Sequence, residues 1–175
     1  MPRIVKIEDM EMGTDYKGRA FRCLGFDIRD LLKVVPAEGQ KLTWSIFPMG
    51  REPTEVTGDL SSVGLSVEQL EKQIESSPTG MVMTSERLLV IAEAIQQTIW
   101  GLYIGCRDAA DFEQIAALPP EERQFLDTAC SAFYERVEIG FQAIDSSFWL
   151  AYARDDAVIE RISAAFSVVT VVASW

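Results

Sequence analysis

Alternation of apolar and polar residues predicts several short strands along the chain. Over residues 41–47, Leu42, Trp44 and Ile46 alternate with polar neighbours, which is typical of a strand with one buried face. A second alternating stretch, residues 137–143, is followed by a polar turn and then by residues 148–153, which predicts a hairpin. Strands are also expected over residues 19–24, 100–106 and 168–173, the last rich in β-branched side chains.

Helical periodicity and capping residues predict the helices. Asp27 is expected to cap a short helix over residues 27–35, and Ser66 with Gln69 fits a capping box for a helix that Ser77-Pro78 ends. A third helix is expected to start at Thr84 or Ser85 and to bury a stripe that extends to Ile99. Further helices are predicted over residues 111–118, from Pro119-Pro120 through residue 133, and from Asp155 to residue 166.

The order of these elements predicts an α+β fold. Strands and helices are mixed without a regular βαβ rhythm, so a mainly antiparallel sheet packed by several helices is expected. The C-terminal order of strand, strand, helix and strand is its clearest signal. With 175 residues, the chain is expected to form a single domain, with a candidate sub-boundary in the irregular loop at residues 48–64.

The residue types present exclude many kinds of chemistry. The chain has no His, so a Ser-His-Asp triad, a Cys-His pair and a His-containing zinc site are excluded. Its three cysteines, Cys23, Cys106 and Cys130, are odd in number and widely spaced, and are interpreted as small buried residues of a reduced, cytoplasmic chain. Phosphate-binding glycine loops, nucleophile elbows and EF-hand loops are missing from the sequence. We therefore expect no metal, no cofactor and no conventional catalysis.

The net charge of −11 limits the partners. Nucleic acids and anionic membranes are disfavoured, because both attract clustered Lys and Arg. The apolar stretches are too short to cross a bilayer, and the N-terminus has no signal-peptide pattern. Residues 1–58 hold nine acidic and nine basic residues, so residues 59–175 carry the whole surplus.

A local run of acidic residues predicts a surface for a basic partner. The candidate partner-binding residues are Arg107, Asp108, Asp111, Glu113, Glu121, Glu122 and Asp127. The alternative interpretation is a solvated helix face that keeps the protein soluble. Glu121 and Glu122 also stand at a predicted helix start, where the helix dipole favours acidic residues.

Three hypotheses for function follow. The first is a non-catalytic cytoplasmic module that binds another protein, such as an acidic inhibitor or immunity-like protein that masks a basic surface. The second is a small-molecule-binding domain or unconventional enzyme, with Trp44, Tyr103, Arg107 and Trp149 as walls of a pocket beside residues 48–64. The third is a homo-oligomer, because the apolar residues 168–175 could lie at a sheet edge and pair across a two-fold axis.

Overall fold

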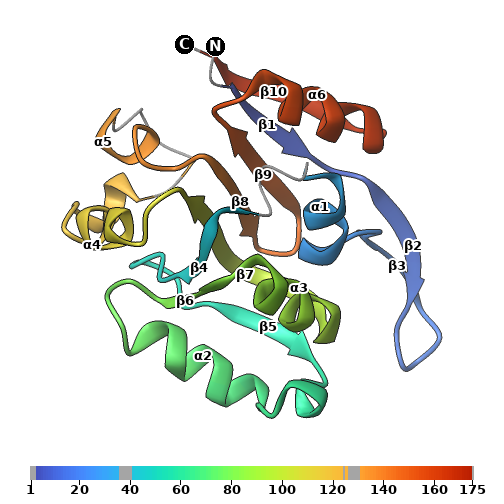
Figure 1. The fold of residues 1–175 in the computed structure, drawn as a ribbon. Coiled ribbons are helices and arrows are strands. Elements are labelled where there is room, and N and C mark those ends of the chain that lie inside the picture. The colour runs from blue at the N-terminus through green and yellow to red at the C-terminus, as the bar shows by residue number, and fades with distance from the viewer. Residues whose placement is uncertain (1–2, 36–40, 124, 126–130, 175) are drawn as a thin grey trace.

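One antiparallel sheet of eight strands organises the computed structural model, which describes residues 3–35, 41–123, 125 and 131–174 (Figure 1). The strand order is β10-β1-β9-β8-β7-β4-β6, with β5 also paired to β7, and every pairing is antiparallel. The fold class is therefore as the sequence predicts. The strands are β1 (Arg3–Ile7), β4 (Thr43–Phe47), β5 (Glu55–Gly58), β6 (Met81–Thr84), β7 (Ile95–Cys106), β8 (Ile139–Ile144), β9 (Phe148–Ala153) and β10 (Val169–Ser174).

Both faces of the sheet carry a hydrophobic core. Consecutive strand residues point to opposite faces, so β9 sends Trp149 to the larger core and Leu150 to the smaller one. The larger core contains residues of α1 (Ile28–Val34), α2 (Val67–Glu75), α3 (Ser85–Ala94) and α6 (Asp156–Ala165). The smaller core holds residues of α4 (Ala110–Ala116) and α5 (Ser131–Tyr134). Among the described residues, no helix is both long and apolar enough to span a membrane.

Several local signals form the structures they predict. The hairpin β8–β9 turns at Asp145 and Ser146, whose positive φ angles of 47° and 54° are those of a tight hairpin turn. Ser66 forms its capping box with Gln69, and the Thr84 hydroxyl accepts the backbone N–H of Arg87 at the start of α3. The C-terminal order β8, β9, α6, β10 is confirmed.

The boundary between α3 and β7 differs from the prediction. The helix ends at Ala94, and Ile95–Cys106 form one strand of twelve residues. A helical stripe through Ile95 and Ile99 was expected, but Ile95, Gln97 and Thr98 pair with β5 instead. β-branched residues such as Ile95 and Thr98 occur in both helices and strands, so the local sequence does not decide between the two structures. Pairing with β5, which is distant in sequence, makes this segment a strand.

The observed elements also differ from the predicted ones where the sequence pattern for a helix or strand is weak. Residues 48–64 are not wholly irregular, because they contain β5 and a 3-10 turn, η2 (Ser61–Val63). The helix expected from Pro119 is replaced by a 3-10 turn, η3 (Pro120–Glu122), and by α5, while residues 124 and 126–130 of that prediction lie outside the described residues. The strand β1 was not predicted, because Arg3 and Lys6 interrupt its apolar positions.

Gly80, directly before β6, lets the backbone pass close to β4. Its φ of +68° is left-handed, and a Cβ there would collide with the carbonyl oxygen of Ile46 and lie 2.9 Å from the Cα of Phe47. Gly80→Ala should therefore cost clearly more stability than the roughly 1–2 kcal/mol of a left-handed alanine. Gly64→Ala is the matched control, with a φ of +75° and no atom within 4 Å of its Cβ. Equal losses for the two variants in denaturant unfolding would contradict the collision.

Candidate functional site

Strand β10 forms an open edge of the sheet. Among the described strands it pairs with β1 alone, with Val169 opposite Ile7, Thr170 opposite Lys6 and Val171 opposite Val5. Residues 167–174 read SVVTVVAS and contain no charged residue. Three valines are exposed, Val168 by 47%, Val171 by 55% and Val172 by 49%. The sequence-based expectation that this segment lies at a sheet edge is thus confirmed.

The edge at β10 has little of the protection that edge strands normally carry. Edge strands are usually short, or bear Lys or Pro, or are bent by a bulge. A shift of register between Val171 and Ala173 provides one bulge, and lysine and proline are absent from residues 167–174. The opposite edge, β6, has only four residues and continues directly into α3. β5, which also has only four residues, pairs with β7 alone among the described strands, so β10 is the longest of these edge strands and the better template for another strand.

Asp9 fixes the point at which β10 begins. Its carboxylate accepts the backbone N–H of Ser167 at 2.7 Å and also that of Val168. The backbone N–H of Glu8 donates to the carbonyl of Val168 at 3.0 Å. Hydrogen bonds to a charged acceptor are stronger than neutral ones, so Asp9 holds the first residues of the edge against β1.

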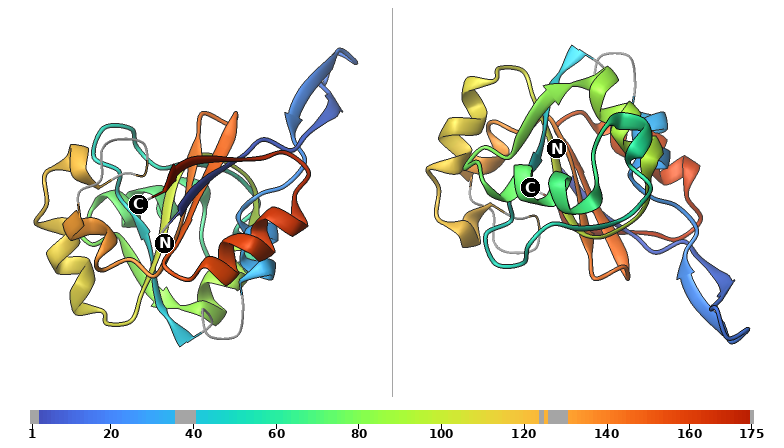
Figure 2. Two further views of the ribbon diagram at one scale, coloured as in Figure 1. Left: turned by 90° about the horizontal axis from the view of Figure 1, so that it is seen from above. Right: turned by 90° about the horizontal axis from the view of Figure 1, so that it is seen from below.

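A two-stranded arm stands beside this edge. Figure 2 shows β2 (Met10–Thr14) and β3 (Ala20–Leu24) projecting away from the rest of the molecule. At its tip, the Asp15 carboxylate accepts the backbone N–H groups of Lys17 and Arg19, both at 2.9 Å. The bond from the Arg19 backbone is the largest of the effects that hold the pKa of Asp15 below its usual value. Tyr16 is 90% exposed, so the tip presents an aromatic ring to solvent.

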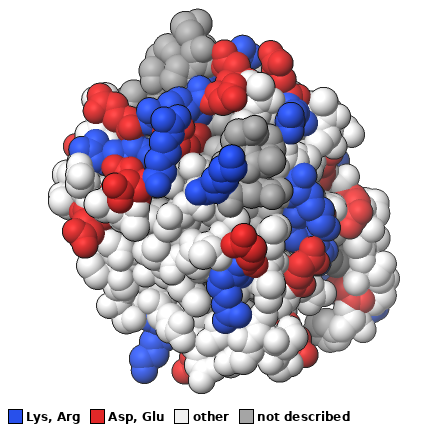
Figure 3. All heavy atoms as spheres, viewed as in Figure 1, with Lys and Arg blue, Asp and Glu red and all other residues white. Residues whose placement is uncertain are grey.

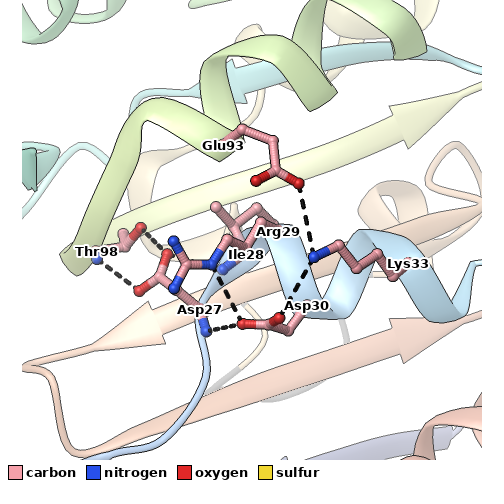
Figure 4. A network of polar contacts seen from close by, with 7 residues as sticks. All are labelled: Asp27, Ile28, Arg29, Asp30, Lys33, Glu93 and Thr98. Atoms are coloured by element: carbon pink, nitrogen blue, oxygen red, sulfur yellow. Dashed lines mark hydrogen bonds and ion pairs between the residues drawn. The ribbon is translucent and has the colours of Figure 1, made fainter. Parts of the chain in front are cut away.

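A buried carboxylate attaches α1 to the start of β7 (Figure 4). Asp27 caps α1 by accepting the N–H of Ile28 at 2.7 Å, and it also accepts the N–H and the hydroxyl of Thr98 at 2.7 and 2.9 Å. The Thr98 hydroxyl lies 3.1 Å from that of Tyr103. Burial is the main cause that raises the pKa of Asp27, and burial likewise raises the pKa of Tyr103. With all these partners inside the protein, the network is structural.

The three aromatic residues predicted to wall a pocket lie in the larger core. Trp44, Tyr103 and Trp149 are each at most 1% exposed. Trp44 stacks on Phe141 with ring centroids 6.2 Å apart, and Tyr103 contacts Trp149 at 5.9 Å. These contacts are packing contacts, whereas the Arg107 side chain is 76% exposed and forms an ion pair with Glu138 at 3.2 Å.

Surface hollows lie elsewhere on the described part of the chain, two of them beside the arm and α2. One of about 410 Å³ sits at the base of the arm, and its lining includes Phe26 and Phe166 with the carboxylates of Asp9 and Asp30. The other, about 520 Å³, lies between β5 and α2, where Glu71 and Glu75 accept backbone N–H groups of residues 56 and 54. No group of three or more acidic or thiol side chains within the described part of the chain is placed to hold a metal ion.

The predicted acidic residues gather around α4 and η3. Asp108 accepts the backbone N–H of Ala110 at 2.9 Å, and Asp111 and Glu113 lie in the first turn of α4. Glu121 and Glu122 form part of η3, and Asp127 lies outside the described residues. In Figure 3, acidic and basic side chains are interspersed over the visible face. The use of these acidic residues for a basic partner stays a prediction.

The described cysteines differ in their accessibility. Cys106 is buried in the smaller core, and burial, more than the nearby Asp111 and Glu138, raises the pKa of its thiol to about 12. It is therefore a protonated, unreactive thiol at neutral pH. Cys23 lies partly exposed on the arm, and Cys130 falls outside the described residues.

The strand expected over residues 19–24 is confirmed as β3, but its partner β2, the anchor at Asp9 and the bond between Asp27 and Thr98 were not predicted. For Asp27, the helix-capping pattern signalled its first role, but nothing local connects it with a residue 71 positions away. Comparison with known proteins adds no assignment, because no protein family, curated protein or solved structure matches the chain.

Removing the Asp9 carboxylate should loosen the start of β10. Asp9→Ala deletes two charge-assisted bonds, so the amides of Ser167 and Val168, which donate to this carboxylate, should exchange with deuterium at least about tenfold faster, corresponding to about 1.4 kcal/mol of local stability. Glu8→Ala is the control, because the Glu8 carboxylate contacts Lys6 at 2.8 Å and only its unchanged backbone contacts Val168. Unaltered exchange in Asp9→Ala would show that β1 pairing alone holds the strand.

The raised pKa of Asp27 predicts how its contribution varies with pH. Asp27→Ala should cost about 2 kcal/mol at neutral pH, because Ile28 and Thr98 lose a buried acceptor. The folded pKa lies above the ordinary value of 3.8, so the contribution of Asp27 is complete below that value and declines as pH rises through the folded pKa. Urea unfolding should thus show a larger advantage of wild type over Asp27→Ala in mild acid than at neutral pH. An advantage that grows with pH would mean a lowered pKa.

Proposed function

We propose that this chain is a cytoplasmic, non-catalytic protein-binding module that adds an extended strand of a partner to its open edge at β10. The observation that carries the proposal is the exposed, uncharged valine segment at the end of an eight-stranded sheet. Unpaired backbone groups of an edge strand form main-chain hydrogen bonds with an added strand, and alternate side chains select it. The partner segment is extended, uncharged and rich in β-branched residues.

The chemistry of the edge favours binding over catalysis. It presents mainly backbone amides and valine methyl groups, which stabilise an added strand, and no base among the described residues contacts the hydroxyl of Thr170 to activate it. The valines lie on a rigid ladder, since β10 is held by β1 along its length and by Asp9 at its start. A preformed edge loses little conformational entropy on binding, which supports strand addition.

The acidic residues around α4 support binding less directly. Asp108 serves the turn before α4, while Asp111 and Glu113 complement the helix dipole, so local structure already accounts for them. Arg107 is engaged with Glu138. No local structural role accounts for the exposed valines of β10, because apolar side chains gain no favourable free energy from contact with water.

Site-specific photo-crosslinking in the native cells tests this proposal. A photoreactive residue replacing Thr170 should give one defined covalent product, whereas the same residue replacing Val90, a valine of α3 that is 50% exposed, should give none. Adding Val171→Lys should reduce the product at least about tenfold, because an edge lysine opposes strand pairing. The absence of a product specific to residue 170 would overturn the proposal.

A further inference from the structure

We infer that the strand added at the edge is β10 of a second copy of this chain, paired antiparallel around a two-fold axis near Thr170. The inference rests on the proposed function, because it names the chain that supplies the strand. A two-fold pairing of this kind joins two sheets into one continuous antiparallel sheet and uses the same surface on both copies.

Charge is the first argument for a second copy. Two molecules that each carry −11 repel one another, and contact between acidic surfaces would bring carboxylates together. Residues 167–174 form an uncharged segment where two copies can approach closely. The adjacent strand β1 contributes Arg3 and Lys6, each beside an acid: Arg3 lies 3.4 Å from Asp156, and Lys6 2.8 Å from Glu8. Beside the edge, these charges occur as opposite pairs, and the Asp9 carboxylate is held by the backbone N–H groups of Ser167 and Val168.

Side-chain register is the second argument. Antiparallel pairing centred on Thr170 places that residue opposite its own copy. Val169 then faces Val171 of the second copy, and Val171 faces Val169. Val171, which is 55% exposed, thus gains a valine partner, and Val–Val and Thr–Thr cross-strand pairs are favourable. The bulge between Val171 and Ala173 falls at the end of this register, so Val169–Val171 remain a regular ladder.

The sheet topology provides the third argument. Among the described strands, β10 is the last on its side and meets β1 along its whole length, so its second edge pairs with no described part of the chain (Figure 1).

Light scattering during size-exclusion chromatography tests the pairing. Over rising concentrations, the wild-type chain should approach twice its monomer mass of 19.6 kDa. Val171→Lys and Val172→Lys should each remain at the monomer mass, while Val90→Lys should behave as wild type. Circular dichroism and melting temperature verify that each variant is folded, and two edge variants keep the test valid if one of them fails to fold.

Oxidative crosslinking tests the register. Thr170→Cys should form a covalent dimer under mild oxidation, well above the level that the native cysteines give in the wild-type chain. Val90→Cys should stay at that level. A covalent dimer from Thr170→Cys that Val171→Lys abolishes would support the two-fold axis near this residue.

The outcomes separate the two proposals. A wild-type chain that stays at 19.6 kDa at every concentration overturns self-pairing. If photo-crosslinking at residue 170 then yields a different protein, the proposed strand addition stands with another partner. A dimer that both edge lysines leave intact also overturns the inference, because it uses another surface. Loss of every product specific to residue 170 overturns both proposals.

Discussion

Strand β7 pairs with β4 and β8 along its second half and with β5 along its first, so one strand of twelve residues aligns three distant parts of the chain. The two cores lie on opposite faces of this strand: Tyr103 enters the larger core, while Leu102 and Ile104 enter the smaller. Asp27 is attached to its first half through Thr98. The position of α1, and through it the path from the arm into the body, therefore depends on β7.

The strand order places β10 at one end of the sheet and β6 at the other. β10 closes on β1, so the two described ends of the chain run side by side at one edge (Figure 1). The arm begins where β1 ends, and Asp9 connects that point to the start of β10. The base of the arm and the start of the open edge at β10 therefore lie next to each other.

Much of the local structure could be predicted because its causes are local. Capping by Asp27, Ser66, Thr84 and Asp155 depends on hydrogen bonds within one turn, and the hairpin at Asp145 depends on its own turn residues. The start of β7 could not be predicted, since Ile95 and Thr98 become strand only by pairing with β5. For the candidate binding edge, the sequence alone showed the apolar character of residues 168–173. Of the arm, β3 was predicted, but β2 was not, because β2 has no buried face and hence no alternating apolar pattern.

By itself, the sequence determined the mixed α+β class, the C-terminal order of elements, the absence of histidine chemistry and an uncharged strand near the C-terminus. Only the tertiary structure decided that β10 lies at the end of the sheet, that Asp9 anchors it, and that Trp44, Tyr103 and Trp149 fill a core. The physical reason is the separation in sequence of the residues in contact, because caps and turns form between residues that are close in sequence. Strand order and burial arise from contacts between residues that only the fold brings together.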